Sequence, residues 1–364
     1  MPARHASRPR TSFTSREPGA SGSPRFRLLA AVASLSLAAL LSACGSAPTS
    51  GSATPDVAPR SAPFDIQGHR GARGLAPENT LAAFERALEI GVSTLELDVA
   101  LTADGVPVIV HDPALNPAIT RDARGAYLTA TGPAIHTLTL AQLQTYDVGR
   151  LDPASKYGQP FSTQAARDGQ RIPTLRQLFD FTQELAATDL RFNIEAKTDP
   201  TAPASTAALE PLVRAILDEV KRAGVQDRVT IQSFDWQALA LVGQLAPGMS
   251  RAWLSSPRTL RDPRWTHGKR LQDFGGSVPR MVKAAAADGT GPAIWSPAFG
   301  DLAAEQVREA HGLGLKVIPW TVNQPADLAR VMDLGVDGII TDYPDRLHAL
   351  VRARGMKLPR GLKN

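Results

Sequence analysis

The 364-residue chain has only one cysteine, Cys44, so no intramolecular disulfide bond can form. It also lacks an excess of charge over most of its length. The net charge of +5 arises in residues 1–43, which hold six arginines and one acidic residue. The remainder keeps 34 of the 40 basic residues and 34 of the 35 acidic ones. A nucleic-acid-binding protein needs a basic patch on its folded domain, and this neutral balance gives that class no support.

The apolar run from Leu28 to Leu41 is too short to span a membrane. Arginines precede it and small residues follow it, which is typical of a secretory signal. Leu41-Ser42-Ala43-Cys44 resembles the bacterial lipoprotein box, in which the cysteine is diacylated and becomes the mature N-terminus. We therefore expect residues 1–43 to be a lipoprotein signal peptide and Cys44 to carry a lipid anchor. The alternative is a plain signal peptide in which Cys44 has no role.

An anchor with more than one acyl chain attaches a protein stably to a membrane. The predicted location is the bacterial cell envelope, on the periplasmic or extracellular face. Residues 44–62 are rich in Ser, Ala, Pro, Thr and Gly and are predicted to be a flexible tether. Residues 63–352 are predicted to form the working domain, and residues 353–364 a basic tail.

Strand-like runs alternate with helical patterns throughout this domain. Several runs are continuously apolar, as buried parallel strands are. We expect nine strands, at Phe64–Gly68, Ser93–Leu101, Pro107–His111, Arg191–Ala196, Arg228–Gln232, Ser250–Leu254, Ala293–Ser296, Leu315–Thr321 and Gly338–Thr341. The expected helices between them include Leu81–Leu88, Leu175–Leu185, Leu209–Ala223 and Pro325–Leu334.

The connection from the second run to the third is too short for a parallel crossover. It contains Asp104-Gly105, a pair that suits a hairpin turn. Eight strands then remain, the number of a (β/α)8 barrel, with an open doubly wound sheet as the alternative. Residues 114–170 do not fit the repeat and contain one short helical piece, Leu140–Tyr146. We expect them to form an insertion on the active-site side of the barrel.

In such barrels the site lies at the C-terminal ends of the strands. The first strand is followed by His69 and Arg70, in a glycine-containing loop that ends at Asn79, the expected N-cap of the first helix. An imidazole beside a guanidinium suits chemistry on a phosphate. The hairpin return is followed by His111.

Two other strands carry charged pairs at spacing i, i+2, which puts each pair on one face. Glu96 and Asp98 belong to the second strand, Glu195 and Lys197 to the fourth. Unpaired acids inside a barrel are costly, and a divalent cation would compensate them. An all-oxygen set of Glu96, Asp98 and Glu195 suits Ca²⁺ or Mg²⁺. The alternative is a structural ion pair, for example between Glu195 and Lys197.

The order of these motifs resembles the glycerophosphodiester phosphodiesterase family, from about Phe64 to Leu350. The matching pieces are His69-Arg70-Gly71-x5-Pro77-Glu78-Asn79-Thr80, Glu96-x-Asp98-Val99-x-x-Thr102-x-Asp104-Gly105, Val110-His111-Asp112, Ile172-Pro173-Thr174-Leu175, Glu195-x-Lys197, Ser233-Phe234, Trp320-Thr321-Val322-Asn323 and Gly335-Val336-Asp337-Gly338-Ile339-Ile340-Thr341-Asp342-Tyr343-Pro344. The resemblance implies metal-dependent hydrolysis of small glycerophosphodiesters to sn-glycerol 3-phosphate and an alcohol on a (β/α)8 barrel.

The resemblance also implies a role for each residue. The metal ligands are Glu96, Asp98 and Glu195; the acid/base pair is His69 and His111; Arg70 and Lys197 face the phosphate; Trp320 faces the glycerol or alcohol portion. As a hypothesis, His69 is the base and His111 the acid, and the order stays open. Water and the glycerol 2-hydroxyl both remain candidates for the first attacking group.

We expect Glu78 to orient a histidine. The alternative role for Glu78 is an acid favoured by the helix dipole. Two other functions remain open: a phosphodiesterase of the same barrel type that acts on lysophospholipids or phosphoinositides, and a non-catalytic envelope lipoprotein that binds a ligand. The sequence predicts no particular oligomeric state.

Overall fold

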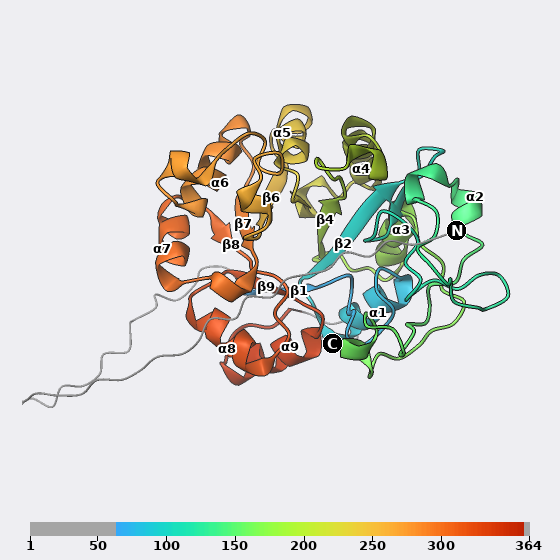
Figure 1. The fold of residues 1–364 in the computed structure, drawn as a ribbon. Coiled ribbons are helices and arrows are strands. Elements are labelled where there is room, and N and C mark those ends of the chain that lie inside the picture. The colour runs from blue at the N-terminus through green and yellow to red at the C-terminus, as the bar shows by residue number, and fades with distance from the viewer. Residues whose placement is uncertain (1–62, 360–364) are drawn as a thin grey trace, which may run out of the picture. The chain divides into compact units, whose positions relative to one another are not determined.

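Eight parallel strands form the central barrel in a computed structural model that describes residues 63–359 (Figure 1). In this part of the chain the strands are β1 Asp65–Gly68, β2 Thr94–Leu101, β3 Pro107–Ile109, β4 Arg191–Ala196, β5 Val229–Ser233, β6 Ser250–Ser255, β7 Ala293–Pro297, β8 Lys316–Val317 and β9 Gly338–Thr341. Their order is β8-β7-β6-β5-β4-β2-β1-β9. The predicted barrel is confirmed, and each predicted run overlaps an observed strand. The predicted signal peptide, Cys44 and the tether lie outside the described residues.

Helices surround the strands (Figure 1). They are α1 Leu81–Ile90, α2 Leu140–Leu143, α3 Leu175–Glu184, α4 Leu209–Ala223, α5 Trp236–Leu245, α6 Val278–Ala285, α7 Ala304–Gly312, α8 Pro325–Asp333 and α9 Pro344–Ala353. The helix α4 has the predicted bounds and buries Leu212, Ile216 and Val220 at helical spacing. It ends at Gly224, whose φ of 68° is the left-handed conformation that favours glycine at a C-cap. Among the described helices, none has the length and apolar character needed to cross a membrane.

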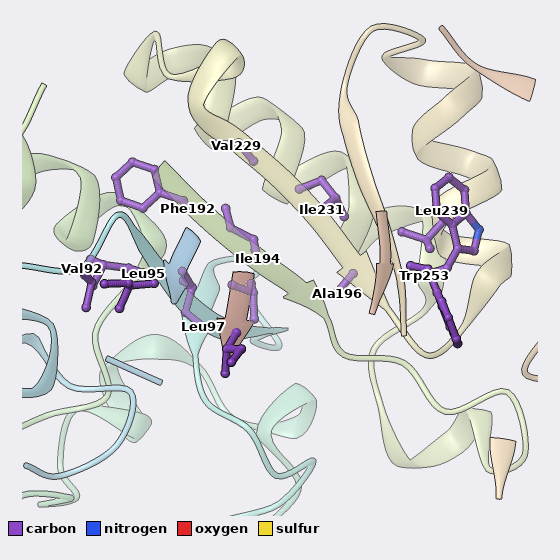
Figure 2. Close-up of a cluster of buried hydrophobic side chains, with 14 of the residues drawn as sticks. Val92, Leu95, Leu97, Phe192, Ile194, Ala196, Val229, Ile231, Leu239 and Trp253 are labelled. Atoms are coloured by element: carbon purple, nitrogen blue, oxygen red, sulfur yellow. The ribbon is translucent and has the colours of Figure 1, made fainter. Parts of the chain in front are cut away.

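The main core lies between the strands and the helices (Figure 2). In the sheet, Leu95 and Leu97 of β2 pair with Phe192 and Ile194 of β4. Side chains alternate between the two faces of a strand. The apolar residues of β2 therefore face the helices, whereas its acidic residues face the inside of the barrel.

The turn between β2 and β3 is a hairpin, as predicted. The two strands pair antiparallel, and Gly105 in the turn has a φ of 76°. Asp104 accepts a hydrogen bond from the Thr102 hydroxyl at 2.6 Å, which fixes the turn. The hairpin returns the chain to the C-terminal end of the barrel, because β2 itself runs well beyond β1.

The barrel is closed between β8 and β9 by separate backbone hydrogen bonds. The strand β8 has only two residues, fewer than predicted, and Pro319, two residues after it, has no N–H to donate. The amide of Asp337 donates to Val317 O at 2.8 Å, and that of Ile340 donates to Pro319 O at 3.0 Å. These bonds replace a regular ladder at this seam.

Residues 114–170 have a small apolar core of their own, made by Leu115, Ile135, Leu143 and Val148 with neighbouring residues of the hairpin. The predicted helical piece is shorter than expected, since α2 ends at Leu143. The end of this insertion contacts the loop after β1. Gln164 Nε2 donates to Arg73 O at 2.7 Å, and Ala165 N donates to Leu75 O at 3.0 Å.

Both ends of the described chain lie at the end of the barrel where the strands begin. Pro63, just before β1, and Lys357–Pro359 line one cavity of about 490 Å³. Ser93 and Arg191, which stand at the starts of β2 and β4, line the same cavity. This cavity is therefore at the N-terminal ends of the strands.

Candidate active site

Three carboxylates meet inside the barrel where β2 and β4 end. Glu96, Asp98 and Glu195 each offer an oxygen, and these oxygens all lie within 4.8 Å of one another. The three residues are 2%, 1% and 7% exposed. Asp98 and Glu195 are direct partners in the parallel register of β2 and β4, which explains why the sequence spacing brings them together.

The three buried carboxylates repel one another, and their pKa values are shifted. Burial and the neighbouring Asp98 raise the pKa of Glu96 well above its usual range. Burial raises the pKa of Glu195 to about 7, although Lys197 opposes this. Burial disfavours the anion of Asp98 as well, but His111, Lys197 and Arg70 hold its pKa well below the ordinary value. A divalent cation would relieve this repulsion, so the oxygen set fits a hard metal ion.

Lys197 lies directly beside the carboxylates. Its Nζ is 3.0 Å from Glu195 Oε1 and 3.5 Å from Asp98 Oδ1. Burial opposes its charge, but these two partners raise its pKa above the ordinary value, so it stays an ammonium. The ion pair between Glu195 and Lys197, which the sequence left as the alternative to a metal site, is therefore present, and it lies within the cluster of three carboxylates.

His69 follows β1 and is held by Asp342, which follows β9. The distance from His69 Nδ1 to Asp342 Oδ1 is 2.6 Å, and His69 Nε2 lies 3.9 Å from Glu96 Oε2. Burial lowers the pKa of His69 to about 4, against the opposite effect of Asp342. His69 is therefore neutral at pH 7. Because Asp342 stays ionised and can only accept, the proton belongs on Nδ1 and the lone pair on Nε2.

His111, which follows β3, has a similar arrangement. Its Nδ1 lies 2.8 Å from Asp112 Oδ1, and Asp112 Oδ2 accepts from Asn116 Nδ2 at 2.7 Å. Burial, Arg70 and Lys197 lower its pKa. The side chain is 33% exposed, against 11% for His69. Both histidines thus have an Nδ1 fixed by a carboxylate.

Arg70 lies between the metal-ligand candidates and the insertion. Its backbone amide donates to Glu96 Oε2 at 2.9 Å, and its Nε lies 3.2 Å from Asp98 Oδ2. Its Nη1 donates to Glu78 Oε1 at 2.6 Å and to Tyr157 OH at 3.1 Å. The residue has a φ of 49°, which is uncommon for a side chain with a Cβ and marks a tightly fixed loop.

A cavity of about 210 Å³ at the C-terminal end of the barrel is lined by both histidines, the three carboxylates and Arg70, but not by Lys197. One wall is charged, and the other is apolar and includes Phe234, Leu254, Trp320 and Ile340. Phe234 and Trp320 pack edge to face with ring centroids 5.2 Å apart. Trp320 Nε1 donates to Ser296 O at 2.9 Å, which fixes its ring. The cavity can therefore hold a phosphate against the charged wall and a carbon skeleton against the other.

A protein-family model described as the glycerophosphoryl diester phosphodiesterase family matches residues 69–346. The chain belongs to this family. A glycerophosphodiester phosphodiesterase of Caldanaerobacter subterraneus subsp. tengcongensis is 31% identical over 288 residues, which are 79% of this chain and 97% of that protein. The predicted family and the predicted class of enzyme, a glycerophosphodiester phosphodiesterase, are thereby confirmed.

Two solved structures extend the likeness. A candidate glycerophosphoryl diester phosphodiesterase from Silicibacter pomeroyi has a TM-score of 0.73 and 37% identity, and covers 82% of this chain and 96% of its own. An Oleispira antarctica phosphodiesterase in complex with the product sn-glycerol-3-phosphate has a TM-score of 0.57 and 25% identity. That comparison covers 80% of this chain and 97% of the other.

Two local predictions are wrong in this phosphodiesterase. Thr80, not Asn79, caps α1: its hydroxyl accepts from Ala83 N at 3.2 Å. The Asn79 side chain instead donates to Asp98 Oδ2 at 2.9 Å, and the residue has a φ of 55°. Glu78 does not orient a histidine, because it is bound by Arg70 and Tyr157.

The sequence reasoning missed four residues of the site. Asp342 belongs to a quoted family motif, but no role followed from the motif alone. Arg73 binds Asp342 through Nε at 2.7 Å and Nη2 at 2.9 Å. Gln232 donates to Glu96 Oε1 at 2.7 Å. Tyr157 reaches the site from the insertion, where no periodic pattern marks it.

Proposed function

We propose that this protein hydrolyses glycerophosphodiesters to sn-glycerol 3-phosphate and an alcohol, with a divalent cation and with His69 and His111 as base and acid. The observation that carries the proposal is the meeting of three buried carboxylates and two carboxylate-bound histidines in one cavity. The product complex of the Oleispira antarctica relative supports the choice of product.

Glu96, Asp98 and Glu195 would hold the cation, Ca²⁺ or Mg²⁺, which would withdraw charge from a non-bridging phosphate oxygen. Arg70 and Lys197 supply fixed positive charge beside the same position. Fixed positive groups in a site shielded from water stabilise the charge that develops on the phosphate.

The histidines would move the protons. His69 accepts at Nε2 the proton of the attacking water, or of the glycerol 2-hydroxyl if a cyclic phosphate forms first and water opens it in a second step. Its low pKa leaves Nε2 unprotonated, and Asp342 holds the other proton at Nδ1. As the new P–O bond forms and the old one breaks, His111 donates a proton to the leaving alkoxide. The negative charge of the bound diester would raise the pKa of His111 and favour the protonated form.

Trp320 and the apolar wall would contact the glycerol or alcohol portion. The ring of Trp320 is fixed by Ser296 O and by the edge of Phe234, so it offers a rigid flat surface. A small uncharged skeleton fits such a surface, whereas the phosphate stays on the charged wall.

The test follows release of glycerol 3-phosphate from glycerophosphocholine and glycerophosphoethanolamine. The purified protein is assayed with Ca²⁺, with Mg²⁺ and with a chelator. His69→Ala should abolish release, whereas His348→Ala, in α9 at the outside of the barrel, should not. Release from neither diester with either ion would contradict the proposal, and lysophospholipids would then be assayed.

We further propose that Cys44 carries a lipid and holds the enzyme at the cell envelope. The support is the Leu41-Ser42-Ala43-Cys44 sequence after the apolar run. Mass spectrometry of the mature N-terminus should show acyl chains on Cys44, and Cys44→Ala should release the protein from membranes. An unmodified Cys44, or cleavage at another position, would contradict this.

A further inference from the structure

A tyrosine of the insertion enters the active site. Tyr157 OH donates to Glu78 Oε2 at 2.5 Å and accepts from Arg70 Nη1 at 3.1 Å. Arg70 Nη1 donates to the other oxygen of Glu78 at 2.6 Å. These three bonds form a closed ring, in which each group is fixed by the other two.

The backbone around Tyr157 is itself fixed against the loop that carries His69 and Arg70. The Arg73 guanidinium stacks over the Phe161 ring, 4.7 Å from its centre. Gln164 donates to Arg73 O, and Tyr343 OH donates to Pro160 O at 3.3 Å. Tyr157 is thus delivered by a segment that packs on the catalytic loop at several points.

The ring of hydrogen bonds between Tyr157, Glu78 and Arg70 sets the orientation of the Arg70 guanidinium. Its Nε faces Asp98 and its Nη1 is held by Glu78 and Tyr157. Within residues 63–359, Nη2 makes no hydrogen bond, and Arg70 lines the cavity. Nε makes no hydrogen bond to Asp98 despite the 3.2 Å distance, so the two bonds of Nη1 are the ones that orient the planar guanidinium and with it Nη2.

Glu78 alone would not impose this orientation. A carboxylate prefers to bind a guanidinium through two parallel hydrogen bonds, using both of its oxygens. Tyr157 occupies Glu78 Oε2 and so restricts Glu78 to a single contact with Nη1. Without the phenol, Glu78 could turn its second oxygen toward the guanidinium and rotate it.

We propose that Tyr157 is a positioning residue that orients Arg70 for the substrate phosphate, so that the insertion is a working part of the active site. This rests on the proposed function, in which Arg70 binds the phosphate. The ligand class is a phosphate monoester or diester, recognised through its non-bridging oxygens.

The test is Tyr157→Phe, which removes only the hydroxyl. Binding of sn-glycerol 3-phosphate and of inorganic phosphate is measured by calorimetry, together with KM and kcat for glycerophosphocholine. Loss of a hydrogen bond to charged groups predicts about tenfold weaker binding of both phosphates. KM should rise more than kcat falls, while the affinity for Ca²⁺ stays unchanged.

The matched control is Tyr127→Phe, in the same insertion. Tyr127 OH is buried and has no hydrogen-bond partner among the described residues. This variant should bind phosphate like the wild type. In the Arg70→Lys background, Tyr157→Phe should have a smaller further effect, because the hydroxyl's shorter contact, 3.1 Å, is with Arg70, whereas Arg73 Nη1 lies 3.5 Å away.

Three results would overturn the proposal: unchanged phosphate binding in Tyr157→Phe, an equal loss in Tyr127→Phe, or an undiminished loss in the Arg70→Lys background. Failure of the proposed function gives a different result. In that case the wild type itself would neither release glycerol 3-phosphate nor bind it.

Discussion

Replacing Asp342 with asparagine should lower kcat by about 10²–10⁴-fold, the usual contribution of a positioned acid or base. Asp342 receives four donors. Oδ1 accepts from His69 Nδ1 and Arg73 Nε, and Oδ2 accepts from Arg73 Nη2 and Asn323 Nδ2, at 2.6 to 2.9 Å. An asparagine of the same shape can offer an oxygen at only one of these two positions.

The amide therefore meets two donors whichever way it turns. If the NH₂ group faces His69, the imidazole has to accept at Nδ1 and carry its proton on Nε2. The nitrogen that would take the substrate proton is then blocked, which removes His69 as a base. If the NH₂ group faces Asn323 instead, His69 keeps a partner, but Arg73 loses a charged one.

Some loss of stability should accompany the change. A hydrogen bond to a charged group contributes about 1.5–3 kcal/mol, so losing one or two lowers the free energy of unfolding by an amount the barrel can tolerate. The assay is the initial rate of glycerol 3-phosphate release at 25 °C, with urea denaturation of the same samples. Both quantities are then known for one preparation.

Asp337→Asn is the matched control. Asp337 also binds a histidine, His311 Nε2 at 2.9 Å, but it precedes β9 at the opposite end of the barrel. Its replacement should affect stability and not kcat. The reasoning about His69 is refuted if Asp342→Asn keeps kcat within threefold of the wild type.

Further predictions concern the metal ligands, the apolar wall and pH. Glu195→Gln should weaken binding of Ca²⁺ and Mg²⁺ in calorimetry; unchanged affinity would exclude it as a ligand. Gln232→Leu leaves Glu96 Oε1 without its donor and should weaken cation binding about tenfold. An unchanged affinity would show that Gln232 does not orient Glu96. Trp320→Ala should raise KM more than it lowers kcat; an unchanged KM would contradict contact with the substrate. With chelator, His69 binds a proton more readily when unfolded, since its pKa falls from 6.5 to about 4 on folding. Through this group, the wild type should lose about 3 kcal/mol of stability as pH falls from 6.5 to 4. His69→Gln should lack that loss, whereas the opposite contribution of Glu195 is present in both proteins; identical pH profiles would contradict the shift.

The sequence predicted the barrel well because its strands are local features. Each strand is an apolar run between helical patterns, and the hairpin follows from one Asp-Gly pair. The carboxylates were also predictable, because spacing i, i+2 fixes their face without any knowledge of distant parts. Glu96, Asp98 and Glu195 meet as expected.

The partners of these residues could not be predicted in the same way. His69 and Asp342 are 273 residues apart, and Arg70 and Tyr157 are 87 apart. Only closure of the barrel and folding of the insertion bring them together. Asn79 was predicted to cap a helix for the same reason: its preference for N-caps is local, whereas its actual partner, Asp98, is brought to it by the fold.

The place where the chain enters and leaves the barrel also has a consequence for how the enzyme meets its substrate. Pro63 and Lys357–Pro359 lie where the strands begin, at the other end of the barrel from the catalytic cavity. If Cys44 is acylated as proposed, this is the end of the barrel to which the anchored segment is joined. The catalytic cavity would then sample the surrounding water. An enzyme anchored in this way would capture deacylated, freely diffusing diesters and not the headgroups of lipids still embedded in the membrane.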